Sequence, residues 1–121
     1  MRIIKTDIVT REDIQYLVNS FYTKVRADEL LAPLFSAVDW PHHLPVMYNF
    51  WSSVLLGDQS YAGNPMSKHL HLPLEKHHFT RWLLLFTATV DENFEGYNAT
   101  EAKNRARLVA DLFQFKMGLI R

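Results

Sequence analysis

Apolar residues recur along this chain at the three- and four-residue spacing of amphipathic helices, and no segment shows the strict alternation of a strand. The first such segment follows Thr10 and Asp13, a capping pair in which each side chain accepts a hydrogen bond from the other residue's backbone N–H. A short helical piece interrupted by Pro33 comes next. The apolar positions of the first predicted helix are Ile14, Leu17, Val18, Phe21, Tyr22 and Val25.

A second long helix is predicted to begin at residues 39–41, Asp-Trp-Pro, because proline suits a first helical turn. Pro45 lacks a backbone N–H, so regular hydrogen bonding should begin near His42 or His43. Gly57 is a candidate C-terminal cap for this helix. The apolar stripe between these ends consists of Val46, Met47, Phe50, Trp51, Val54 and Leu55.

Two more helices are predicted beyond a long loop over residues 58–73. The helix over residues 74–94 is apolar almost all round, which is typical of a central helix, and Gly96 ends it. Asn98 and Glu101 form a second capping signature, which starts the last helix. The inward positions of the last helix are Ala102, Ala106, Val109, Phe113, Met117 and Ile120.

These elements predict a single all-α domain over residues 1–121, with a loosely ordered N-terminal segment over residues 1–9. Apolar residues make up 48% of the chain and charged residues 21%, as in globular proteins. Because 13 basic residues balance 13 acidic ones, charge gives no reason to expect nucleic acid or an anionic membrane as a partner. The absence of cysteine excludes disulfides and thiolate ligands.

The N-terminal residues show no signal-peptide pattern. The longest apolar run, residues 82–86, is far shorter than the roughly 20 residues that cross a bilayer. We therefore expect a cytoplasmic protein. Since no additional apolar helix face is evident in the sequence, we expect a monomer.

Four of the six histidines lie within residues 67–82, where the long loop meets the third helix. His77 and His78 fall in a first helical turn, where positive charge is unfavourable, so we expect them to be neutral, exposed or supporting a neighbour. His69 and His71 alternate with leucines just before the central helix. A neutral imidazole directed at a core needs a partner, and a metal is one such partner.

Three kinds of metal site differ in what they require. Structural zinc needs four ligands, usually including cysteine. A di-iron bundle needs two Glu-x-x-His motifs, and this chain has one, Glu75 to His78. Haem needs one axial histidine and a flat apolar slot. Periodicity alone leaves open whether the aromatic stripes wall such a slot or form an ordinary core, and whether His43 is a core histidine.

Four segments closely resemble the group III truncated haemoglobins of bacteria. They are FYTKVRADELLAPLF (21–35), DWPHHLPVMYNFWSSVLLG (39–57), YAGNPMSKHL (61–70) and HFTRWLLLF (78–86), in order across about residues 12–115. The most specific parts are the Phe-Tyr pair, Trp-x-x-His followed by Asn-Phe-Trp, and the histidine after a Tyr-x-Gly-x-Pro loop. The resemblance implies a truncated globin, a two-over-two helical sandwich around haem b.

By position, the resemblance implies that His69 is the proximal ligand of a five-coordinate haem iron, with His71 a neighbour that has no ligand role. It places three polar residues in the distal ligand pocket, His43 among them as a donor or a movable gate. Tyrosine and tryptophan side chains are hydrogen-bond donors, as this pocket requires. The distal residues are Tyr22, His43 and Trp82, and the residues lining the haem pocket are Phe35, Phe50, Trp51, Phe79 and Phe86.

The resemblance thus implies a haem protein that binds O2, CO and NO. Polar distal residues favour tight holding of oxygen, since each hydrogen bond contributes roughly 1 kcal/mol. A haem-dependent redox enzyme for nitric oxide or peroxide, served by a reductase partner, is the alternative within this class. An alternative of a different class is a non-haem helical protein that binds a divalent metal through its histidines.

Overall fold

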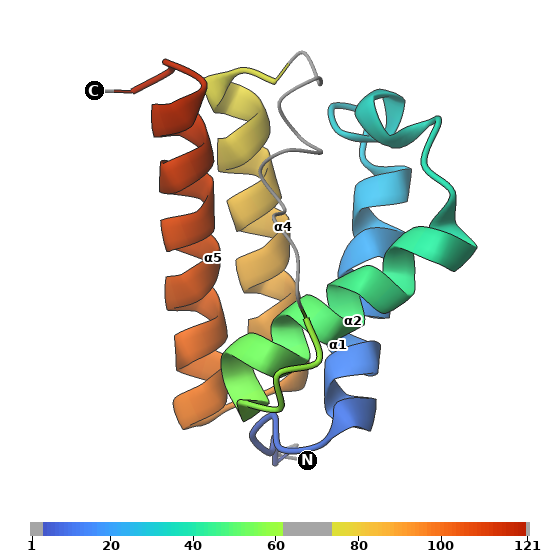
Figure 1. The fold of residues 1–121 in the computed structure, drawn as a ribbon, viewed down its shortest axis with the longest axis vertical. Helices are drawn as coiled ribbons and strands as arrows, with labels where there is room; N and C mark the ends of the chain where they lie inside the picture. The colour runs from blue at the N-terminus through green and yellow to red at the C-terminus, as the bar shows by residue number, and fades with distance from the viewer. Residues whose placement is uncertain (1–3, 62–73, 121) are drawn as a thin grey trace.

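The computed structural model describes residues 4–61 and 74–120, and these form two pairs of helices. The helices are α1 (Arg11–Ala27), the short 3-10 helix η1 (Ala32–Phe35), α2 (Trp40–Leu56), α4 (Lys76–Asn93) and α5 (Tyr97–Lys116). In Figure 1, α4 and α5 run antiparallel side by side, while α2 crosses α1. Helix α1 packs on both α2 and α4, which joins the two pairs. The all-α architecture predicted from the sequence is confirmed.

Helix α1 begins as its sequence predicts. The Thr10 side chain accepts the backbone N–H of Asp13 at 3.1 Å, and the Asp13 carboxylate accepts the N–H of Thr10 at 3.1 Å. This capping box satisfies backbone donors that have no partner inside the helix. Its inward face is buried as predicted, at Ile14, Leu17, Val18, Phe21, Tyr22 and Val25.

Helix α2 is bounded by the predicted signals. The N–H groups of His42 and His43 both donate to the carbonyl of Asp39, at 3.1 and 2.8 Å, so hydrogen bonding begins where Pro45 requires. At the other end Gly57 has a φ of 70°, the left-handed conformation that glycine adopts without steric cost. The two ends of α2 are therefore set by local sequence.

Helix α4 is central, and Phe86, Thr89 and Val90 on it are completely buried. It ends at Asn93, with Phe94 as its C-terminal cap, so the prediction that Gly96 ends it is wrong. Gly96 is instead the N-cap of α5, at a φ of 140°. A Cβ at this position would lie 2.6 Å from Cγ of Asp7, so only glycine fits beside that side chain.

The start of α5 depends on Asp7 rather than on the predicted Asn98–Glu101 capping pair. The Asp7 carboxylate accepts the backbone N–H groups of Asn98 at 2.9 Å and Ala99 at 2.8 Å. Burial acts to raise the pKa of Asp7, but the N–H groups of Asn98, Ala99 and Ile8 outweigh it and lower the pKa below 3.8. Glu101 pairs with Arg105 along the helix surface instead, at 2.9 Å.

The N-terminal segment, predicted to be loosely ordered over residues 1–9, is attached to the helices from Thr6 onward. The carbonyl of Thr6 accepts the N–H of Glu95 at 3.0 Å, and Ile8 is completely buried in the core. No helix among the described residues is long and apolar enough to cross a membrane.

Candidate functional site

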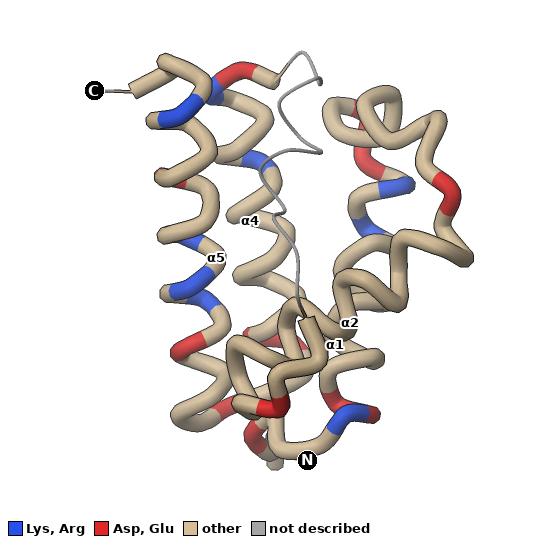
Figure 2. Tube along the Cα trace, in the orientation of Figure 1, with Lys and Arg blue, Asp and Glu red and all other residues tan. Residues whose placement is uncertain are grey.

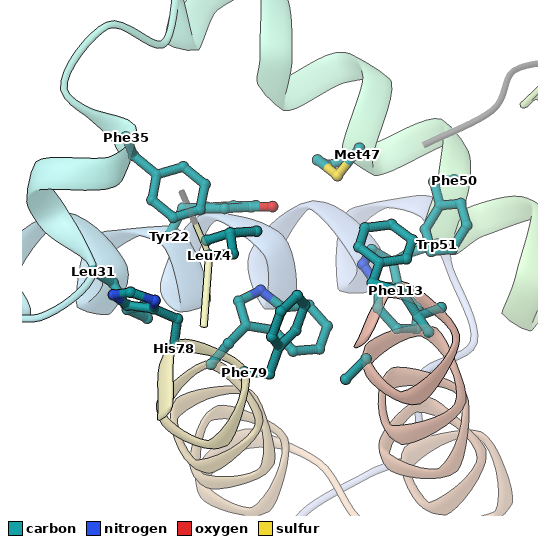
Figure 3. A pocket seen from close by; sticks show the side chains of 13 residues that line it. Tyr22, Leu31, Phe35, Met47, Phe50, Trp51, Leu74, His78, Phe79 and Phe113 are labelled. Atoms are coloured by element: carbon teal, nitrogen blue, oxygen red, sulfur yellow. The ribbon is translucent and has the colours of Figure 1, made fainter. Parts of the chain in front are cut away.

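The two helix pairs border an apolar cavity that is open to solvent, and the space between its walls, including the solvent at its opening, is about 760 Å³. All four long helices and η1 contribute to its walls (Figure 3). The lining residues are Tyr22, Leu31, Phe35, Met47, Phe50, Trp51, Leu74, His78, Phe79, Trp82, Val109, Ala110 and Phe113.

Tyr22 is the polar group deepest in this cavity. Its side chain is 7% exposed and extends from α1 with its hydroxyl toward the open space (Figure 3). Burial raises the pKa of Tyr22 well above 10. The hydroxyl therefore remains protonated over the physiological pH range and is available as a hydrogen-bond donor.

Two side chains of α2 pack on the ring of Tyr22. The ring centre of His43 lies 5.6 Å from that of Tyr22, and the centre of Trp40 lies 5.0 Å from it. Arg26 lies over Trp40, with its guanidinium carbon 5.0 Å from the ring centre. His43 is thus held beside Tyr22 at the edge of the cavity and is not part of its lining, whereas Tyr22 and Trp82 are.

Trp82 belongs to a stack of aromatic rings that supports the cavity wall. Its ring is stacked on Phe86 at 5.7 Å, and Phe86 is stacked on Trp51 at 4.8 Å. Phe86 lies one turn beyond Trp82 on the buried side of α4, so it supports the wall from behind and does not line the cavity. Four other residues were predicted to line the haem pocket, and all four line this cavity: Phe35, Phe50, Trp51 and Phe79.

His78 lines the cavity where α4 begins. Its Nδ1 accepts the backbone N–H of Glu75 at 2.9 Å, which completes a capping box at the start of the helix. Burial and the nearby His77 ring, 4.2 Å away between centres, lower the pKa of His78 below 6.5. The sequence predicted that His78 is neutral, exposed or supporting a neighbour, and it gave no indication of a place in the cavity wall.

The chain leaves α2 through a set of short polar contacts. Asp58 accepts hydrogen bonds from Ser52 and Ser60, which lower its pKa, and the N–H of Tyr61 donates to Ser53 at 2.8 Å. The Tyr61 ring then packs edge-on against Phe50 at 5.4 Å. This anchors the last described residue before position 62 beside the cavity. His69 and His71 lie outside the described residues.

Several lining residues were not predicted to line the site. Met47 and Phe113 belong to apolar stripes that the sequence shows, but periodicity does not distinguish a core position from a cavity position. Val109 likewise belongs to the predicted inward face of the last helix, whereas Leu31 and Leu74 carry no signal of their own. Their place in the cavity follows from how separate segments meet in space.

An all-α sandwich around an apolar cavity, with a buried tyrosine and tryptophan among its lining residues, is the arrangement of a globin. The chain belongs to the bacterial-like globin family, whose sequence profile matches residues 7–117. Haem b is the cofactor of globins, and the mainly apolar cavity with few polar groups fits it. The resemblance to group III truncated haemoglobins is confirmed.

Individual relatives agree with this assignment. The chain is 34% identical to a group 3 truncated hemoglobin (ctb) of Campylobacter jejuni, over 92% of this chain and 93% of the relative. The crystal structure of a group III truncated hemoglobin from Campylobacter jejuni matches with a TM-score of 0.85 at 33% identity, covering 94% of this chain and 95% of that one. A truncated hemoglobin from Tetrahymena pyriformis in its Fe(III) form matches with a TM-score of 0.71 at 25% identity, covering 91% and 92%.

Proposed function

We propose that this globin binds O2, CO and NO at a haem iron held by His69 and left open on the side of Tyr22. The observation that carries the proposal is the Tyr22 hydroxyl, a buried donor in a mainly apolar cavity. When bound, haem supplies the iron at which diatomic ligands coordinate. The residues of this chain then decide how firmly a ligand is held.

A ligand that carries partial negative charge gains most from donors in a dry pocket, because the surrounding dielectric is low. Tyr22 and Trp82 supply an O–H and an N–H from opposite helix pairs, α1 and α4. Both residues are fixed by packing: Tyr22 by Trp40 and His43, Trp82 by Phe86. Such donors favour tight holding of oxygen over easy release, as expected from the sequence.

His43 has a different part in this proposal. Its ring packs on Tyr22 and Trp40, with 5.6 Å between ring centres in each case, and does not line the cavity, so a change of its side-chain angle is needed to bring it to the distal side. We propose it as a gate and as a proton donor or acceptor for the redox alternative, in which nitric oxide or peroxide is the substrate and a reductase partner supplies electrons.

The test is a hemin titration followed by absorption spectroscopy of the wild type and His69→Ala, with His71→Ala as the matched control. We expect a Soret band that saturates at one haem per chain in the wild type and in His71→Ala, and a lost or shifted band in His69→Ala. A band unchanged by His69→Ala would contradict His69 as the ligand.

A failure of all three proteins to take up haem would favour the divalent-metal alternative. The described part of the chain contains no cluster of three or more His, Cys, Asp or Glu arranged for a metal, so such a site would need residues outside it. Titration of the same proteins with zinc would detect it.

A further inference from the structure

Three large apolar side chains lie exposed along one stripe of α5. Leu108, Leu112 and Phe115 expose 59%, 50% and 59% of their surface. Their spacing of four and three residues places them on one side of the helix, away from the face on which Ala106 and Phe113 are buried. An exposed apolar stripe of this kind marks an interaction surface more often than scattered exposed residues do.

Charged residues border this α5 stripe in an ordered way. By helical spacing, Arg107 and Asp111 fall on one edge, while Arg105 and Lys116 fall on the other, and Glu101 continues the stripe toward the start of the helix. Charges of both signs are visible along α5 in Figure 2. Within the described residues, Arg107, Asp111 and Lys116 form no ion pair.

We propose that the α5 stripe is a dimer interface, in which α5 packs antiparallel against α5 of a second copy of this chain. With the two-fold axis at the level of residue 109, Arg107 and Asp111 lie about 3 Å on either side of it, at 1.5 Å of rise per residue. Each Arg107 then faces the partner's Asp111, and the two leucines of each copy meet at the centre. Glu101, about 12 Å from the axis, faces the partner's Lys116, which lies about 10.5 Å from it.

The charges select a second copy in this orientation. In a parallel pair, the edge that carries Arg107 and Asp111 would instead face the partner's opposite edge. Arg107 would then lie almost level with the partner's Arg105, and like charges side by side are unfavourable. In the antiparallel pair two different contacts become complementary at a single position of the axis. A surface that is self-complementary in this way fits a closed two-fold dimer.

The size of the stripe indicates a weak dimer. Stable interfaces bury about 800 Å² on each partner, and three large side chains on one helix supply only part of that area. We therefore expect a dimer that forms at high micromolar concentration and leaves the haem cavity, on the other side of α5, unaffected.

Sedimentation velocity from about 1 µM to about 1 mM, the range that separates a weak interface from none, tests the proposal. We expect the wild type to shift from monomer to dimer and Leu112→Ser to remain monomeric throughout. Leu84→Ser is the matched control, because Leu84 is equally exposed at 58% but lies on α4. It should dimerise like the wild type.

Charge exchange distinguishes this interface from general apolar adhesion. Arg107→Asp should weaken the dimer at least several-fold, and Arg107→Asp combined with Asp111→Arg should restore it, since each pair is re-formed with its signs exchanged. Circular dichroism confirms the fold of each variant. A wild type that is monomeric up to about 1 mM, association that persists in Leu112→Ser, or a double variant as weak as the single one would overturn the proposal.

Discussion

The backbone N–H of Glu75 donates to Nδ1 of His78 at 2.9 Å, at the point where α4 begins and the cavity wall passes from loop to helix. The neutral imidazole must then carry its proton on Nε2. Protonation of Nδ1 would replace an acceptor by a donor and break the cap. The charge of His78 therefore affects the start of α4, which forms part of the cavity wall.

This link predicts a pH dependence of stability. The pKa of His78 is lowered in the fold, so the stability that it contributes is complete above its unfolded pKa of about 6.5 and declines as the pH falls toward the lower folded value. His78→Asn keeps a side-chain acceptor for the Glu75 N–H but does not titrate. Melting temperatures of His78→Asn should therefore fall less steeply between about pH 7 and pH 5 than those of the wild type.

His42→Asn, at an exposed position on α2, is the control for this experiment. Its melting temperature should depend on pH as steeply as that of the wild type. Equal slopes for the wild type and His78→Asn would show that the cap does not sense pH.

Tyr22→Phe tests the distal donor. Removing a hydrogen bond to a partly charged acceptor costs about 1.5–3 kcal/mol, so oxygen should dissociate from the haem-loaded variant roughly 10 to 100 times faster. CO accumulates less charge, and its dissociation should change much less. Stopped-flow ligand displacement measures both rates.

Tyr48→Phe removes a hydroxyl of the same kind, bonded to Asn19 between α1 and α2 and not part of the cavity lining. It should leave both rates unchanged. An oxygen dissociation rate unaffected by Tyr22→Phe would mean that the Tyr22 hydroxyl does not reach the ligand.

Asp7→Ala should destabilise the whole domain, because it removes the acceptor for the N–H groups of Asn98 and Ala99 at the start of α5. Loss of such a cap costs about 1–2 kcal/mol in urea unfolding at neutral pH. The pKa of Asp7 is lowered, so its contribution is present above pH 4 and is lost as the pH falls through the folded pKa. The difference in the free energy of unfolding between Asp7→Ala and the wild type should become smaller as the pH falls through the folded pKa of Asp7. Glu29→Ala, at an exposed position, should change little.

Two glycine substitutions should destabilise the protein to different extents. Gly57→Ala meets open space and costs only the strain of a positive φ, about 1 kcal/mol. Gly96→Ala adds a Cβ 2.6 Å from Cγ of Asp7 and must displace the α5 cap as well. Urea unfolding should show the larger loss for Gly96→Ala, by about 1 kcal/mol or more. The reverse order would mean that Asp7 moves aside without cost.

Local signals in the sequence were enough for most of the fold. The capping box of Thr10 and Asp13, the prolines of α2 and Gly57 each act within one or two turns, and the structure has each element where these residues predict it. The start of α5 was mispredicted because its cap comes from Asp7, about 90 residues away, where no local pattern announces it.

The site was predictable to a similar degree. Tyr22, Trp82 and four of the five predicted lining residues border the cavity, while Phe86 and His43 stand just outside it. Period and residue type tell which face of a helix is buried, but not whether that face meets another side chain or an open space. The role of His69 as the iron ligand stays a prediction, since His69 lies outside the described residues.

The contact between Asp7 and α5 also bears on how the chain is made. During synthesis at about 5–20 residues per second, Asp7 leaves the ribosome roughly 5 to 20 seconds before its partners at Asn98 and Ala99 exist. Through that interval the nascent chain has the acceptor but not the helix, and the start of the last helix gains its cap only when the N-terminal segment meets it. A fusion or tag that restrains the first residues would therefore act on the final step of folding.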